Sequence, residues 1–329
     1  MRSLEELRAV IESRPDDFNA LYEMTMAYRQ EHNYAACFAM SERLIASYDK
    51  RPIANEQNRY FEIKRLHSQM MREHLADILG PSSRLLDTRW MPVFRLGRPR
   101  EMAWKITPSN ARHMRAAFEA PQLKKLRFLS ITFEDSPNEA LKVLREVYLG
   151  GLKVLNLIFM NSPDESIFQS LWSNAGDQFK NICSLSLRMP FINTPMAVAV
   201  RNAFGSLESL SMTSLDRRGI DQEFAEYLAD DLQSQALTRL ALVGTSIGDE
   251  GLFALFSSEN FNNLQALDLH DGILTNNAGR VFQAAHNLPK LRHVDVRYNN
   301  IDPAGINMIQ HACINCVVDG QHTRPVGRI

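Results

Sequence analysis

A single apolar motif, L-x-x-L-x-L, recurs through most of the sequence and restricts its fold more than any other feature. Isoleucine, valine or methionine replaces leucine at some positions, and successive copies begin 25 to 30 residues apart. The seven copies begin at Leu126, Leu152, Ile182, Leu207, Leu237, Leu264 and Leu291. Because helix-start residues follow the copies, this period predicts a solenoid in which strands and helices alternate.

The leucines of the motif explain why such units must stack. In a strand, alternate side chains share a face, so the spacing L-x-L puts two apolar side chains on one side. One unit cannot bury that face alone, and neighbouring units therefore stack with parallel strands about 4.8 Å apart. We predict an α/β fold, a right-handed curved solenoid of seven or eight strand–helix units. Its parallel sheet lines the concave face and its helices lie outside.

The units resemble leucine-rich repeats of the ribonuclease-inhibitor type over residues 99–318. The most specific stretches are GTSIGDEGLFALF, residues 244–256, and LRHVDVRYNNIDPAGINMI, residues 291–309. Asn299 stands at the family's asparagine position, where the resemblance implies that its amide satisfies backbone groups of the loop. The other units depart from this pattern, with Thr245, Gly272, Met160 and Pro190 among the replacements. We therefore expect irregular loops in the earlier units.

Residues 1–80 lack the motif and show helical spacing instead. Ser3 and Glu6 form a capping-box pattern, and a long helix is predicted over residues 55–79. We expect a helical bundle over 1–80, a connector and N-terminal cap over 81–98, and the solenoid with its C-terminal cap over 99–329. Residues 9–44 resemble a helical companion domain that precedes such repeats in many bacterial proteins, or a single tetratricopeptide unit.

Composition excludes several classes of partner. The chain has 37 basic and 38 acidic residues, a net charge of −1, so we expect no nucleic-acid partner and no anionic membrane surface. No stretch approaches 18 consecutive apolar residues, so we expect no membrane span. Four cysteines in 329 residues are too few for a disulfide scaffold, which indicates a cytoplasmic protein.

Catalytic signatures are missing from the sequence. It contains no G-x-x-x-x-G-K-[ST], G-x-S-x-G or H-E-x-x-H, so we expect no enzyme activity, no cofactor and no metal. Asp249 and Glu250 are interpreted as a helix N-cap and its acidic neighbour rather than a carboxylate pair. For Cys313-x-x-Cys316 we favour buried structural thiols, with a redox pair or a zinc site as alternatives.

The outward positions of each strand, the third, fifth and seventh residues of a unit, form the candidate binding surface. Charge and imidazole gather at its C-terminal end. The candidate partner-binding residues are Arg188, Arg239, Asp268, His270, Asp271, His293, Asp295, Arg297 and Tyr298. We expect Asp268 and Asp295 to be neighbours on adjacent strands with His270 and His293 nearby, and a partner arginine to engage the two carboxylates.

The sequence favours a non-enzymatic adaptor or recognition subunit of a bacterial cytoplasmic complex. In this hypothesis a protein partner binds the concave strand face, and the N-terminal helices dock a second protein. One alternative is a regulator that inhibits or activates an enzyme in trans, as some relatives of this type do. Another is a metal-dependent enzyme that uses Asp268, His270, His293 and Asp295.

Overall fold

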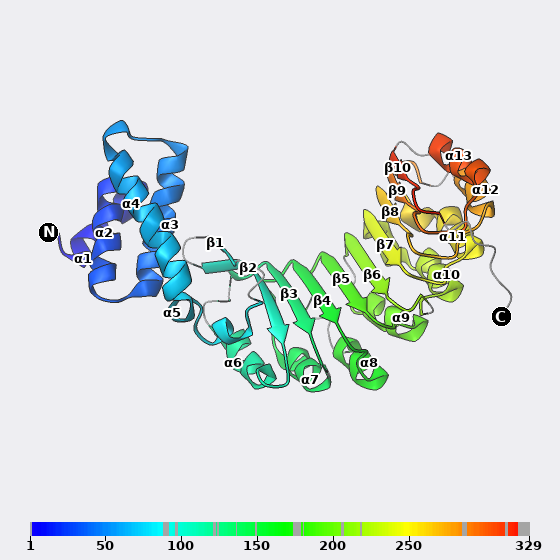
Figure 1. The fold of residues 1–329 in the computed structure, drawn as a ribbon, viewed down its shortest axis with the longest axis horizontal. Coiled ribbons are helices and arrows are strands. Elements are labelled where there is room, and N and C mark those ends of the chain that lie inside the picture. Colours follow the sequence, from blue (N-terminus) through cyan, green and yellow to red (C-terminus); the bar gives the residue numbers. More distant parts are fainter. Residues whose placement is uncertain are drawn as a thin grey trace. The chain divides into compact units, whose positions relative to one another are not determined.

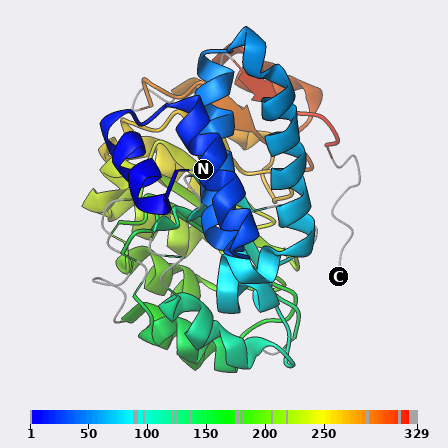
Figure 2. The ribbon, with the colours of Figure 1, turned by 90° about the vertical axis from the view of Figure 1, so that its left-hand side faces the viewer.

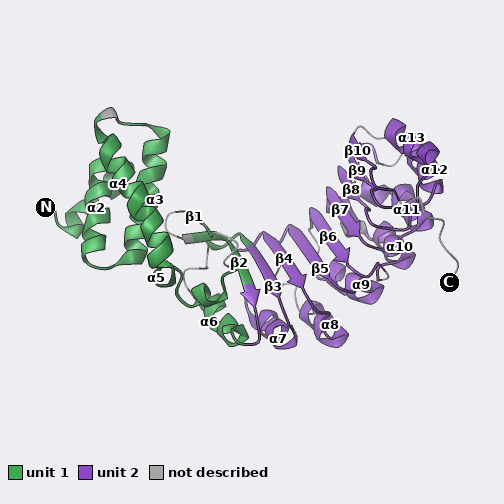
Figure 3. Ribbon diagram, viewed as in Figure 1, with its two compact units in different colours: residues 1–104, 109–128 green, residues 105–108, 129–329 purple. Residues whose placement is uncertain are grey.

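The structure is a computed structural model of the whole chain. It describes residues 2–87, 92–95, 98–120, 123, 125–135, 137–148, 150–173, 179, 181–204, 207–217, 219–284, 288–312 and 315–321. The chain forms two compact units (Figure 3). The first contains residues 1–104 and 109–128, and the second contains residues 105–108 and 129–329. The domain boundary at residues 98/99 stays a prediction.

The first unit begins with helices that pack around one apolar core (Figures 1 and 2). They are α1 (Leu4–Ser13), α2 (Phe18–Gln30), α3 (Tyr34–Lys50), α4 (Gln57–Glu73) and α5 (Leu75–Leu79). The Ser3–Glu6 capping box is present, because the Ser3 side chain accepts from the Glu6 backbone and the Glu6 carboxylate accepts from the Ser3 N–H. The single helix predicted over 55–79 is wrong: His74, with φ −123° and ψ 23°, separates α4 from α5.

Two strands follow these helices in the first unit. Strand β1 (Val93–Arg95) pairs antiparallel with β2 (Arg98–Ile106), and helix α6 (Met114–Glu119) comes after them. Trp104 on β2 is fully buried and meets Phe118 edge to face, with ring centroids 4.8 Å apart. Trp104 is therefore a core residue of the first unit. The sequence also predicts that Trp90, Phe94 and Trp104 cover the open N-terminal end of the solenoid. This stays a prediction, since Trp90 lies outside the described residues and the side chain of Phe94 is not among those described.

The second unit is the strand–helix solenoid. Its strands are β3 (Phe128–Phe133), β4 (Val154–Phe159), β5 (Ser184–Met189), β6 (Ser209–Ser214), β7 (Arg239–Val243), β8 (Ala266–Asp268), β9 (His293–Asp295) and β10 (Asn315–Val317). Its helices are α7 (Asn138–Glu146), α8 (Glu165–Ser173), α9 (Thr194–Asn202), α10 (Gln222–Asp230), α11 (Asp249–Ser257), α12 (Asn277–Ala284) and α13 (Pro303–Ala312). The strands lie side by side in chain order.

The sheet buries the leucines of the motif as predicted. Every neighbouring pair from β4 to β10 is parallel, and the motif leucines pair in register, as Leu210 does with Leu240. Burial alternates along β4 and β6, with buried leucines on the side of the helices. Within this unit the strands line the inside of the bend and the helices its outside (Figure 1). The predicted fold class is confirmed.

Polar side chains at the starts of α11, α12 and α13 join consecutive units. The Asp249 carboxylate accepts from the Thr275 backbone N–H at 2.9 Å and from the Thr275 hydroxyl, while Gly248 is the N-cap of α11. The predicted N-cap role of Asp249 is therefore wrong. Asn276 and Asp302 make the same kind of bridge one unit later. Asp302 also caps α13 by accepting from the Gly305 N–H.

Asn299 is the most extensively bonded polar residue of the solenoid interior. Its side chain is fully buried, and its Nδ2 donates to the carbonyl oxygens of Leu269, Val296 and Arg297 at 2.9 to 3.2 Å. Its Oδ1 accepts from the Leu274 backbone N–H at 2.9 Å. One amide thus satisfies buried backbone groups of two neighbouring units, which is the role implied by the resemblance.

We predict that Asn299→Leu lowers the free energy of unfolding by about 2–4 kcal/mol, because it leaves buried backbone groups without partners. Asn300→Leu, at the half-buried neighbouring position, should cost less than about 1 kcal/mol. Urea unfolding midpoints of the two variants test this. Equal midpoints would show that the amide network adds nothing to stability.

His67 in α4 gives the helical unit a pH-dependent stability. Its ring stacks on Phe38 at 4.2 Å, and its Nδ1 lies 2.9 Å from the Ser41 hydroxyl, which itself donates to the Phe38 carbonyl oxygen. Burial lowers the pKa of His67 to about 4. The unfolded chain, with a histidine pKa of about 6.5, then binds a proton that the folded chain excludes.

The stabilisation is therefore complete above about pH 6.5 and declines as the pH falls towards 4. We predict a loss of about 1–2 kcal/mol of local opening free energy in α3 and α4 between pH 7 and pH 5. Peptide-resolved hydrogen exchange of the full chain, corrected for intrinsic rates, measures it. His67→Asn should remove most of this dependence, and an unchanged dependence in that variant would assign it to another group.

Candidate protein-binding surface

The outward side chains of the parallel strands form aligned rows across the sheet, and we call the strand face that carries them the concave surface. The first row runs across Ser184, Ser209, Arg239, Ala266, His293 and Asn315. The second row, two residues further along each strand, runs across Ser186, Ser211, Ala241, Asp268, Asp295 and Val317. Serines occupy both rows on β5 and β6, and the charged and imidazole side chains lie on β7 to β9.

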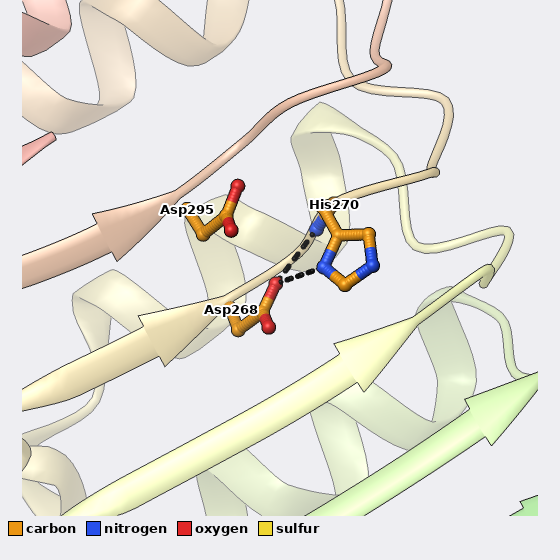
Figure 4. Close-up of side chains that lie close together, drawn as sticks. All are labelled: Asp268, His270 and Asp295. Carbon is orange, nitrogen blue, oxygen red and sulfur yellow. Dashed lines mark hydrogen bonds and ion pairs between the residues drawn. The ribbon is translucent and has the colours of Figure 1, made fainter. Parts of the chain in front are cut away.

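Asp268 and Asp295 are direct neighbours in the second row, as expected (Figure 4). His270 folds back onto Asp268: its Nδ1 lies 2.7 Å from Asp268 Oδ1, and its backbone N–H donates to the same oxygen at 3.1 Å. His293 does not join them. It lies in the first row, opposite Ala266 and Asn315, because it precedes Asp295 by two residues on β9. Residues two apart on a strand share a face but lie in successive rows.

Asp295 and Asp271 each form an ion pair with an arginine of the chain. Arg297 holds the Asp295 carboxylate with both Nε and Nη2, at 2.6 to 3.0 Å, and this bond raises the pKa of Arg297. Arg217, in the loop after β6, pairs with Asp271, in the loop after β8. The carboxylates that we expected to engage a partner's arginine are thus already paired within the chain.

The structure allows a test of the metal alternative. Ligand atoms of Asp268, His270 and Asp295 lie within 4.8 Å of one another. Carboxylate and imidazole are suitable ligands for several divalent ions. A metal ion would, however, have to break the contact between His270 and Asp268 and displace the two-point contact of Arg297 from Asp295. We therefore assign no metal site to these three residues, and His293 lies outside the group.

Three cationic or imidazole side chains of the concave surface have no such partner. Arg188 on β5, Arg239 on β7 and His293 on β9 are all exposed, and none of them forms an ion pair within the part of the chain that the structure describes. Arg239 and His293 flank Ala266 in the first row. The sequence placed these residues on the surface, but their lack of partners emerges from the structure.

The concave surface is hollowed over β6 to β10. The hollow has a volume of about 310 Å³, with Ser211 and Ala241 in its floor and Arg239, Asp268, His293 and Val317 among its other lining residues. Small side chains at the floor permit the backbone of a bound chain to approach closely. The hollow thus combines small side chains, among them Ser211 and Ala241, with the charged groups of Arg239, Asp268 and Asp295.

The loops that leave β7, β8 and β9 share one backbone conformation. Gly244, Asp271 and Tyr298 all have positive φ, between 55° and 64°, at the eighth position of their units. This conformation turns the chain from the strand towards the helix and sets Asp271 and Tyr298 beyond the strand ends. Sequence reasoning missed it, although the glycine at position 244 was a signal.

We predict that Gly244→Ser destabilises the solenoid by about 1–3 kcal/mol, because L-residues are strained at positive φ. A Cβ there would also meet the Ser214 carbonyl oxygen at 2.1 Å. Gly248→Ser is the matched control: Gly248 is an N-cap in extended conformation, and a Cβ at that position would lie 3.8 Å from the nearest side chain. Thermal unfolding compares the two, and equal melting temperatures would contradict a strained loop at Gly244.

Three of the four cysteines lie among the described residues. Cys37 is buried in the helical unit, where burial raises the pKa of its thiol to about 11 and makes it unreactive. Cys183 and Cys316 are half-exposed. The half-exposure of Cys316 contradicts the expected burial of that thiol. Cys313 lies outside the described residues, so a redox or zinc role of Cys313-x-x-Cys316 stays a prediction.

Comparison with known proteins agrees with this architecture. A leucine-rich repeat family model matches residues 233–256 and 287–309, which include β7 with most of α11 and β9 with most of α13. Both matches lie in the second unit and support the leucine-rich repeat resemblance noted in the sequence. The ribonuclease-inhibitor type and the resemblance of residues 9–44 to a companion domain stay predictions. Leucine-rich repeats characterise protein-interaction modules, and at this coarse level the chain is one.

Two solved structures illustrate how far the likeness extends. A protein from Bacteroides fragilis is 13% identical, with a TM-score of 0.47 over 66% of this chain and 73% of its own. An internalin from Listeria monocytogenes is 16% identical, with a TM-score of 0.33 over 65% of this chain and 57% of its own. No curated protein matches the sequence.

None of the helices that the structure describes is both long and apolar enough to span a membrane.

Proposed function

We propose that this chain is a non-enzymatic adaptor or recognition subunit of a cytoplasmic bacterial complex, and that its protein partner binds the concave surface. The observation that carries the proposal is the hollow over β6 to β10. Small side chains and charged groups line this hollow together. The leucines of the underlying sheet are buried in the core, so the outward residues are available to a partner. Such a surface admits a partner's backbone and offers polar contacts for specificity.

The two other hypotheses have less support. A regulator that meets the basic rim of an enzyme needs Asp268 and Asp295 to be available, but His270 and Arg297 occupy them. A metal-dependent enzyme needs the same carboxylates and a site that excludes water, and this cluster lies half-exposed on an open sheet. The contacts among the described residues therefore favour recognition over either alternative.

The helical unit is proposed to dock a second protein. This proposal is supported by the apolar core of the helices, which belong to a compact unit separate from the solenoid. Exposed Phe61 on α4 and exposed Ile53 just before α4 provide apolar contacts on its surface.

Blocking the concave surface tests the main proposal. Ser211→Trp fills the hollow from its floor, whereas Arg280→Trp adds the same side chain to the exposed side of α12. We predict that proteins captured from the native lysate by the wild type are retained by Arg280→Trp and reduced about tenfold or more by Ser211→Trp. Quantitative mass spectrometry of the captured proteins is the measurement. Undiminished capture by a folded Ser211→Trp variant would place the interface elsewhere.

A further inference from the structure

The charges of the concave surface divide into paired and unpaired groups. Its acids have internal partners: Asp268 contacts His270, and Asp295 is held by Arg297. The exposed groups without an ion pair among the described residues are cationic or basic, namely Arg188, Arg239 and His293. A partner that approaches this surface therefore meets two arginines and one imidazole that form no ion pair among the described residues.

Two of these groups are arranged as a slot. Arg239 and His293 occupy the first row on β7 and β9, with Ala266 of β8 between them. Neighbouring strands are about 4.8 Å apart, so the two side chains originate about 10 Å from each other. Because Ala266 has only a methyl group, space remains above it between the two longer side chains. All three residues line the hollow. A carboxylate above Ala266 would meet the guanidinium on one side and the imidazole on the other.

The groups beside the slot indicate what kind of chain fits it. Ser209 and Ser211 continue the low floor towards β6, which leaves room for an extended backbone. Asp268 and Asp295 lie in the next row, where Asp268 is hydrogen-bonded to His270 and Asp295 forms an ion pair with Arg297. Both aspartates next to the slot therefore already have partners within the chain, and a partner's carboxylate can bind in the first row between Arg239 and His293.

We propose, on the basis of the proposed function, that the partner presents an acidic peptide segment and seats an aspartate or glutamate over Ala266 between Arg239 and His293. The anchor is charge-assisted hydrogen bonding to Arg239, and Arg188 attracts further acidic side chains towards β5. The recognised chemistry is a carboxylate on an extended peptide. Single-stranded nucleic acid fits less well, because the second row has no aromatic side chain for base stacking and contains two aspartates.

Selection from a random peptide library tests this proposal with the full chain. Peptides of about ten residues, extended at about 3.3 Å per residue, are long enough to cross the hollow. We expect selected peptides to share an aspartate or glutamate and to bind Arg239→Glu at least about tenfold more weakly than the wild type. Arg280→Glu makes the same charge change on α12 and should bind like the wild type, and circular dichroism verifies that each variant is folded.

Several outcomes would overturn the proposal. Selected peptides that lack acidic residues, or that bind Arg239→Glu as tightly as the wild type, would remove the slot as the anchor. Binding of a single-stranded oligonucleotide that depends on Arg239 and competes with the peptides would also overturn the proposal. If Ser211→Trp abolishes capture of the native partner while Arg239→Glu does not, the concave interface stands and the carboxylate anchor fails. If neither variant affects capture, the proposed function fails as well.

Discussion

The burial of the motif leucines between neighbouring units is the constraint on which the solenoid depends. A single strand–helix unit has one apolar strand face and one apolar helix face, and it can cover them only by stacking against further units. Leu210 and Leu240, paired in register on adjacent strands, are both nearly fully buried. Because the leucines occupy alternate positions, the residues between them must face outward. The same pattern that builds the core therefore creates the concave surface.

This constraint also decides how the polar residues are used. Buried Asn299 serves backbone groups of two units, and Asp249 serves the next unit through Thr275. Asp295 and Arg297 share a face because they are two residues apart, and they neutralise each other there. The charges left on the strand face are Arg188 and Arg239, with exposed His293 beside them. The proposed function thus uses groups that have no ion pair among the described residues.

The sequence predicted much of this arrangement, and its failures have physical reasons. Spacing alone located every strand from β3 to β9 and placed Asp268 opposite Asp295, because parallel strands with a constant repeat align in register. The pairing of Asp295 with Arg297 was predictable too, since residues i and i+2 of a strand share a face. It was missed because the residues were treated as one partner-binding group. His293 was expected near that cluster although its position puts it one row away.

Other features depend on contacts between units and had weaker signals. Asp249 resembled an N-cap within its own unit, but its partner Thr275 lies one repeat further along the chain. Arg217 and Asp271 are 54 residues apart, and no local pattern connects them. The interruption of the predicted helix at His74 also had no sequence signal, since the residues around it are compatible with a continuous helix.

Hydrogen exchange of the full chain, with and without its captured partner or a selected peptide, tests the central claim most directly. Binding on the concave surface predicts slower exchange in β6 to β9 and the loops that follow them, and unchanged exchange in α9 to α13 on the other side of the solenoid. Protection confined to those helices or to α1–α4, with the strands unaffected, would contradict binding on the concave surface.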